Sequence, residues 1–434
     1  MPRPGSFSIG FRTGASYLLG VALGVLLVGC GNSATPAAPA TLDQNVAPAP
    51  SAETDSLPNE TLTTLHAFHR TDGNRPVALV RAANGTLYGA TKGGGATDQG
   101  IVFALSPEGA LTTLHVFQGS DGSAPVALVL DADSNLYGIT SDGGAAHDGT
   151  LFEISASGSF RVVASFIGTN GAFPDALVLG GDGNLYGTTA LGGPAFTSNV
   201  DVSVEGYGTL FRVTPEGELT TLWAFSGIDG YQPTGLLQAA DGTLIGISSG
   251  GGPTFQNTSQ FGGGTVFSLS PSGILTTLYG LDNFTASQPT SLVQAGNGDL
   301  YVTTYGGGQN GNGVVLQITP AGAVTLLFEF SGNDGTSPAS LTLGSDGNLY
   351  GTTYQGGPNY QFGGSDAGAG TVFQLTPGGV LTTLYAFNGP DGATPNALLL
   401  SAGGILYGTT GQGGGGADMP GVGGTVFQLS GIAR

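Results

Sequence analysis

Five aspartates stand at the same place in a recurring segment of the chain. Each is followed by glycine and, three residues after that glycine, by proline; they are Asp72, Asp121, Asp229, Asp334 and Asp391. Carboxylates repeated in this way on one face of a ring could bind a cation such as Ca²⁺. The same Asp-Gly step also begins tight turns, because Asp accepts hydrogen bonds from nearby backbone and Gly adopts a positive φ. We favour the turn interpretation and keep Ca²⁺ binding as the alternative.

Aromatic residues mark a second candidate site. Three long glycine-rich loops share a Gly-Gly-Pro step followed by an aromatic residue, at Phe196, Phe255 and Tyr360, and further rings follow at Tyr207, Phe261 and Phe362. Such rings beside Asn, Gln and Asp could stack on sugars and so bind a glycan. They could equally fasten a long loop to the body of the protein, and we favour this second interpretation.

The sequence contains no recognisable catalytic constellation. His66 and His115 occupy a strand position that holds Trp223 and Tyr279 in other units, so we expect them to be packing residues. There is no Ser-His-Asp spacing, no cluster of metal ligands and no cysteine nucleophile. The many glycines precede no helical pattern, which argues against a nucleotide-binding loop.

These residues lie in a unit of about fifty residues that occurs seven times. Its best-kept step is Leu-Tyr-Gly, as in Leu136-Tyr137-Gly138, and the fifth unit varies it as Leu300-Tyr301-Val302. In the sixth unit, alternation and turn residues predict four strands, named A to D in chain order. They cover residues 339–343, 349–353, 371–375 and 380–387.

Four short strands joined by tight turns form an antiparallel meander. Neither face of these strands carries charge, as expected when sheets stack around an axis. We therefore predict an all-β fold, a seven-bladed β-propeller of four-stranded antiparallel blades. A β-helix is the alternative, but it needs shorter repeats. The array opens with a strand D at 62–68 and closes with a strand C at 425–429, so we expect the N-terminal strand to complete the last blade.

The repeat resembles a known family. Residues 344–353 (Gly-Ser-Asp-Gly-Asn-Leu-Tyr-Gly-Thr-Thr), 370–377 (Gly-Thr-Val-Phe-Gln-Leu-Thr-Pro) and 381–387 (Leu-Thr-Thr-Leu-Tyr-Ala-Phe) are similar to the GloVer tandem repeat of bacterial surface-anchored proteins. The resemblance covers residues 61–429. It implies a repeat architecture and a membrane-anchored location, and it brings no established activity.

The N-terminus predicts a lipid anchor. Residues 1–29 hold two arginines, no acid and a short apolar run, which is typical of a secretory signal peptide. The run ends Leu27-Val28-Gly29-Cys30, which resembles the lipobox of bacterial lipoproteins, and that resemblance implies lipidation of Cys30. Residues 30–60, rich in Ala, Pro, Ser and Thr, read as a disordered tether to a propeller at 61–434. We expect the cell envelope, with Gly31 favouring the outer membrane.

The net charge and the similarity of the repeats limit the functions that we expect. The 434 residues carry a net charge of −20, which disfavours nucleic acid as a partner. We expect a monomer that acts as a binding or scaffold module, for a glycan or protein, through the face that holds the B–C and D–A loops. The alternative is a carbohydrate-active or other hydrolytic enzyme with carboxylates at the mouth of the central channel. We favour binding, because an enzyme breaks symmetry at the axis and these units look alike there.

Overall fold

The computed structural model describes residues 60–194, 196, 206–253, 262–358, 360, 367–414 and 423–432. Predictions for the signal peptide, Cys30 and the tether therefore lie outside the described residues. The described part of the chain consists of strands β1 to β28 and connecting turns. It offers no helix with the length and apolar character needed to cross a membrane.

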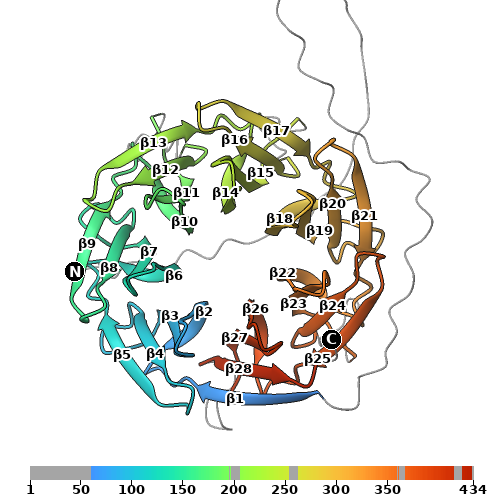
Figure 1. Cartoon of the computed structure of the whole chain (residues 1–434), viewed down its shortest axis with the longest axis horizontal. Coiled ribbons are helices and arrows are strands. Elements are labelled where there is room, and N and C mark those ends of the chain that lie inside the picture. Colours follow the sequence, from blue (N-terminus) through green and yellow to red (C-terminus); the bar gives the residue numbers. More distant parts are fainter. Residues whose placement is uncertain are drawn as a thin grey trace, which may run out of the picture. The chain divides into compact units, whose positions relative to one another are not determined.

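The strands form seven four-stranded antiparallel sheets arranged as blades around a central axis (Figure 1). The innermost strands, A, are β2 (Asn74–Arg81), β6 (Ser123–Leu130), β10 (Ala172–Leu179), β14 (Tyr231–Gln238), β18 (Ser287–Gln294), β22 (Thr336–Leu343) and β26 (Ala393–Leu400). The next strands, B, are β3 (Leu87–Gly93), β7 (Leu136–Asp142), β11 (Leu185–Leu191), β15 (Leu244–Gly250), β19 (Leu300–Gly306), β23 (Leu349–Gln355) and β27 (Leu406–Gln412).

The two outer positions of each blade complete the set. Strands C are β4 (Ile101–Leu105), β8 (Thr150–Ile154), β12 (Thr209–Val213), β16 (Thr265–Leu269), β20 (Val314–Ile318), β24 (Thr371–Leu375) and β28 (Thr425–Ser430). Strands D, on the rim, are β5 (Leu111–Val116), β9 (Phe160–Ser165), β13 (Leu219–Ala224), β17 (Leu275–Gly280), β21 (Val324–Glu329), β25 (Leu381–Ala386) and β1 (Thr61–Ala67). We number the blades 1 to 7 from β2 to β28, and the seven-bladed propeller predicted from the repeat is confirmed.

The ring is closed by the N-terminal strand, as predicted. β1 pairs antiparallel with β28, from Thr61 opposite Ser430 to Ala67 opposite Thr425, and supplies strand D of blade 7. Phe68, directly after β1, is fully buried against Phe103 of blade 1, with ring centroids 5.1 Å apart. The first strand therefore joins the last blade to the first.

The Leu-Tyr-Gly step exists because strand C places a phenylalanine beside its glycine. Gly351 pairs with Phe373, and a Cβ at Gly351 would lie only 2.3 Å from the Phe373 ring. The other Gly–Phe pairs are 89/103, 138/152, 187/211, 246/267 and 408/427. Blade 5 changes both partners, since Val302 pairs with Leu316. The pair conserves volume in a close-packed core.

Strand A begins earlier than the sequence suggested. β22 starts at Thr336 and runs through Pro338, where the expected strand started at residue 339. The ladder shifts register directly after this proline, so Pro338 occupies a bulge, where its missing N–H is tolerated. The residue before the proline, Ser337, has a φ of 52° and donates its backbone N–H to the Asn312 carbonyl of the preceding blade, at 2.7 Å.

The same left-handed step occurs in all seven blades. The residues before the proline have φ between 50° and 57°, and they are Arg75, Ala124, Phe173, Gln232, Gln288, Ser337 and Thr394. Each donates its backbone N–H to a carbonyl near the end of the preceding B–C loop. A positive φ in a residue that precedes proline is unfavourable, so these blade-to-blade hydrogen bonds hold the strained rim of the channel in place.

Candidate ligand site at the mouth of the channel

One face of the propeller gathers the D–A and B–C loops. Strand A begins on this face and strand B ends there, and the A strands lie nearest the centre of the ring (Figure 1). We call this end of the ring the channel mouth. A cavity of about 520 Å³ lies at this mouth, lined by residues of blades 3 to 7. Its size falls in the range of small-molecule sites.

The residues that line this cavity come from two parts of the repeat. One part is the proline of strand A with the residue before it and the residue after it. The other part is the sixth residue of strand B. The residue before that proline is the one that has a positive φ in every blade. The residue after the proline is Val77, Val126, Asp175, Thr234, Thr290, Ala339 or Asn396. The sixth residue of strand B is Lys92, Ser141, Ala190, Ser249, Tyr305, Tyr354 or Gly411. The expectation that the units look alike at the axis is therefore wrong at these positions.

Two adjacent blades place a tyrosine at the same position of the channel mouth. Tyr305 and Tyr354 take the same position in blades 5 and 6, and 49% and 40% of their surfaces are exposed. Among the tyrosines of the Leu-Tyr-Gly steps, Tyr137 and Tyr350 are buried and the others are half-buried. Large rings that remain exposed beside a cavity offer flat faces to a ligand.

Asp175 is the carboxylate of the cavity. Within the described residues it has no hydrogen-bond or ion-pair partner, and it follows the proline of blade 3. Burial raises its pKa to about 6, although the positive charge of Lys92 opposes the shift. A desolvated carboxylate in a cavity is typical of a functional group, because a purely structural acid finds a partner.

Two polar residues of the cavity serve the ring itself. The Thr290 hydroxyl donates to the Pro338 carbonyl of the next blade at 2.6 Å, and the Asn396 amide donates to the Pro76 carbonyl of blade 1 at 3.0 Å. Asn396 also accepts a hydrogen bond from Thr409. These two side chains join neighbouring blades, whereas Asp175, the two tyrosines and the Thr234 hydroxyl, which has no hydrogen-bond partner among the described residues, are available to a ligand.

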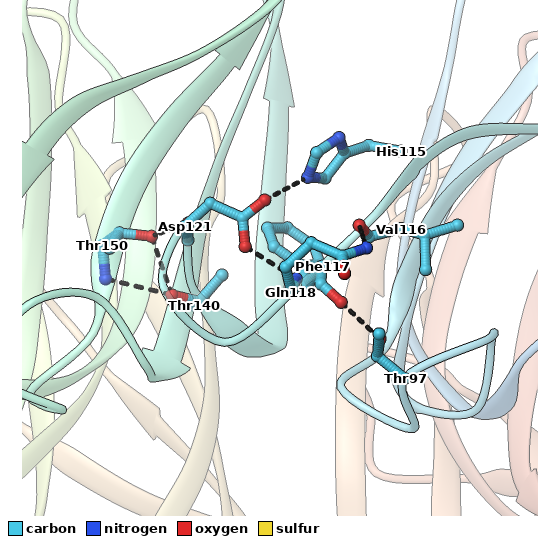
Figure 2. A network of polar contacts seen from close by, with 8 residues as sticks. All are labelled: Thr97, His115, Val116, Phe117, Gln118, Asp121, Thr140 and Thr150. Atoms are coloured by element: carbon cyan, nitrogen blue, oxygen red, sulfur yellow. Dashed lines mark hydrogen bonds and ion pairs between the residues drawn. The ribbon is translucent and has the colours of Figure 1, made fainter.

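The repeated aspartates of the D–A loops act as turn acceptors. Figure 2 shows Asp121, whose Oδ1 accepts the Gln118 N–H at 2.7 Å and whose Oδ2 lies 2.8 Å from His115 Nε2. The Thr150 hydroxyl donates to the Asp121 backbone carbonyl at 3.0 Å, which holds the loop against strand C of the next blade. His115 therefore fixes the loop in addition to packing, stacked on Phe160, and sequence reasoning missed this role.

The other four aspartates repeat this arrangement with different partners. In each, Oδ1 accepts the backbone N–H three residues earlier, at Asp72, Asp229, Asp334 and Asp391. The outer oxygen meets the strand D side chain: His66, Trp223 and Tyr385 face Asp72, Asp229 and Asp391. Blade 5 has Phe328 there, so Asp334 takes the Ser331 hydroxyl instead, and burial raises the Asp334 pKa. Ca²⁺ binding stays a prediction; the described residues contain no cluster of three or more potential metal ligands.

The loop aromatics divide between described and undescribed residues. Phe196 lies over Gly168, where a Cβ would come within 2.2 Å of the ring, and Tyr360 lies over Gly332 in the same way. Tyr207 packs edge-on against Tyr231, with ring centroids 5.9 Å apart. These contacts are those of rings that fasten a loop. Phe255, Phe261 and Phe362 lie outside the described residues, and glycan binding by the six rings stays a prediction.

Three consecutive D–A loops each carry an exposed apolar side chain. Ile167, Ile228 and Phe284 have 54%, 70% and 83% of their surfaces exposed. They follow β9, β13 and β17 and therefore lie on the channel-mouth face. Exposed apolar groups on adjacent loops are typical of an interaction surface. Sequence reasoning missed them because no repeated motif marks an apolar residue in these loops.

Fold and site together define a seven-bladed β-propeller with an asymmetric channel mouth. Residues 55–259 and 253–431 match the model of the Gloeobacter/Verrucomicrobia repeat, and the chain belongs to this family, as its resemblance to the GloVer repeat indicated.

Solved structures with the same fold include enzymes. A streptogramin B lyase shares 12% identity at a TM-score of 0.60, over 87% of this chain and 99% of the lyase. Virginiamycin B lyase from Staphylococcus aureus shares 13% identity at a TM-score of 0.59, over 86% of this chain and all of the lyase. At this identity the likeness establishes the fold alone. No curated protein matches the chain.

Proposed function

We propose that this propeller is a binding module whose ligand, a glycan chain, docks on the channel mouth and the surrounding loops. The observation that carries the proposal is that the repeats differ where they line the channel. There they place Tyr305, Tyr354 and Asp175 around a cavity of about 520 Å³.

The chemistry of the mouth supports a sugar. Two exposed rings in neighbouring blades offer stacking faces for the apolar side of a pyranose, and a carboxylate accepts hydrogen bonds from hydroxyl groups. The apolar arc at Ile167, Ile228 and Phe284 extends the contact surface beyond the cavity. An extended polymer would use both areas at once.

The test is a glycan array probed with the purified full chain, with and without Ca²⁺. We expect binding that is lost when Tyr305 and Tyr354 are both changed to Ala at unchanged melting temperature. Ile274→Ala is the control, because Ile274 is also exposed, at 65%, but lies in a C–D turn on the opposite face. Phe196→Ala and Tyr360→Ala report on the loop rings separately. Binding that survives the double tyrosine change would remove the channel mouth as the site.

Asp175 supports a second candidate, a hydrolytic enzyme acting on carbohydrate. A carboxylate with a pKa of about 6 could serve as a general base near neutral pH. We expect any glycan that binds to release reducing ends slowly, with a rate that rises as the pH passes 6 and disappears in Asp175→Asn. Binding without turnover in the wild-type protein would leave the binding module as the function.

We also propose that the module is a monomeric lipoprotein of the cell envelope, tethered through lipid on Cys30. The support is the lipobox-like end of the N-terminal apolar run. Cys30→Ala should move the protein from the membrane to the soluble fraction and abolish incorporation of labelled palmitate. Unchanged membrane fractionation would contradict the anchor.

A further inference from the structure

A second cavity lies on the opposite face, between blades 3 and 4. It measures about 810 Å³ and is bounded by the A–B turns of both blades and the C–D turn of blade 4. Leu222, Leu244 and Leu269 form its apolar floor. Gly181 donates its backbone N–H to the Gln238 side chain at 2.9 Å, which joins the two blades beside the cavity.

Arg212 is the cation of this cavity. It lies in β12, and within the described residues its guanidinium makes no hydrogen bond or ion pair; its Nε is buried without a partner. A buried charged donor without a partner is costly. The chain carries only nine basic residues against 29 acidic ones, so a cation without a partner is unexpected.

Blade 2 shows how this fold normally treats a charge at the same position. Its strand C holds Glu153, which forms an ion pair with Arg161 directly across the ladder. In blade 3 the residue across from Arg212 is Thr220, which offers no charge. In blade 6 the equivalent Gln374 donates to the Tyr350 hydroxyl at 3.0 Å. Arg212 alone among these residues is left for a group from outside the chain.

The walls of the cavity indicate which anion fits. Asp182 and Asp241 stand in the two A–B turns that bound it. Burial alone would raise the Asp182 pKa, but hydrogen bonds from Asn184 and Tyr186 outweigh burial and lower it. The Asp241 pKa is lowered by hydrogen bonds from Thr243. Two ionised carboxylates repel a phosphate dianion but accept hydrogen bonds from hydroxyl groups.

We propose that this cavity binds a sugar acid, whose carboxylate pairs with Arg212. Its hydroxyl groups donate to Asp182 and Asp241, and its C–H face lies on the leucine floor. The planar guanidinium matches a carboxylate in bidentate geometry. The site is separate from the channel mouth, and neither proposal depends on the other.

The experiment is titration calorimetry of the full chain with D-galacturonate, D-galactose and inorganic phosphate. We expect galacturonate to bind. Galactose should bind at least about tenfold more weakly, because it lacks the carboxylate that forms the charge-assisted hydrogen bonds. Phosphate should also bind more weakly than galacturonate, because Asp182 and Asp241 repel it. Absence of galacturonate binding, or tighter binding of phosphate, would overturn the proposal.

Variants assign the binding to Arg212. Arg212→Gln should weaken galacturonate at least about tenfold without lowering the melting temperature, because glutamine fills this position in blade 6. Arg161→Gln is the matched control and should bind normally. Thr220→Glu should abolish binding while the protein stays folded, because it supplies the carboxylate that blade 2 has across its ladder. Binding unchanged in Arg212→Gln or Thr220→Glu would exclude Arg212 as the contact.

Discussion

Asp175 lies in a candidate site, and its ionised carboxyl lowers the stability of the folded protein. Its pKa rises from 3.8 unfolded to about 6 folded, so the folded protein binds this proton more tightly. The carboxyl costs almost nothing below about pH 3, where it is protonated in both states. The cost grows as the pH rises through 6 and is complete above it, at about 2–3 kcal/mol.

Asp175→Asn should therefore stabilise the protein by about 2 kcal/mol at pH 8 and leave it almost unchanged at about pH 3, as measured by urea denaturation. Asp98→Asn is a control of opposite sign. The hydrogen bond from Arg70 lowers the pKa of Asp98, so Asp98 contributes stability above its unfolded pKa. A stability gain that is equal at both pH values would exclude ionisation of Asp175 as the cause.

Asp121 tests the two interpretations of the repeated aspartates. If it is a turn acceptor for Gln118 and a partner of His115, Asp121→Ala should cost about 1–2 kcal/mol of unfolding free energy. Asp121→Asn keeps an acceptor for the backbone N–H and should cost less than half of that. Urea denaturation with and without millimolar CaCl₂ decides between them. Stabilisation by Ca²⁺ that Asp121→Asn abolishes would support a cation site.

The turn role of the repeated aspartates could be predicted from the sequence, whereas the residues at the channel mouth could not. Asp-Gly before proline is a local signal, and its hydrogen bonds are local too. Asp175, Tyr305 and Tyr354 carry no local signal, because each lies in a strand that looks ordinary by itself. Aligning the seven units and asking which positions vary inside the strands would have found them.

At the scale of the strand pair, the fifth blade provides a natural double substitution. Gly faces Phe across strands B and C in six blades, while Val302 faces Leu316 in blade 5, and both are fully buried. Compared with the Gly–Phe pairs, blade 5 has a larger side chain in strand B and a smaller one in strand C. The repeat is therefore maintained by pairs of residues, and a change in one partner alone is expected to overpack the core.

Gly351→Val should destabilise the protein by about 2–3 kcal/mol, since the new side chain meets the Phe373 ring. Phe373→Leu alone should also destabilise it, by leaving a cavity. The double variant should recover at least half of the summed loss, as a double-mutant cycle in urea would show. Additive losses would mean that the two side chains do not share one volume.

Strand existence was predictable, and strand ends were less so. Alternating residues and turn steps located β23 and β24 within two residues. The start of β22 was missed because a proline is normally read as a strand break. Here it occupies a bulge after a residue with positive φ, Ser337, whose backbone N–H donates to a carbonyl of the preceding blade. That bond joins residues far apart in the sequence, so local reasoning has no access to it.

For the whole molecule, stability depends on closing the ring. Thr61 pairs with Ser430, so the two ends of the repeat array meet at one edge of blade 7. Without β1, strand β28 would present an unpaired edge, which is prone to aggregation. Removal of Phe68 would also leave Phe103 of blade 1 without its ring partner.

Deletion of residues 61–68 should therefore unfold or aggregate the protein, as judged by gel filtration and thermal melting. The decisive companion is a circular permutant in which the same residues follow Ile432 through a short turn. Because β28 ends beside the start of β1, the transplanted strand can fold back as an ordinary C–D hairpin. We expect it to melt cooperatively close to the intact protein. A deletion variant that melts as well as the permutant would show that the seventh blade needs no fourth strand, and ring closure would lose its role in stability.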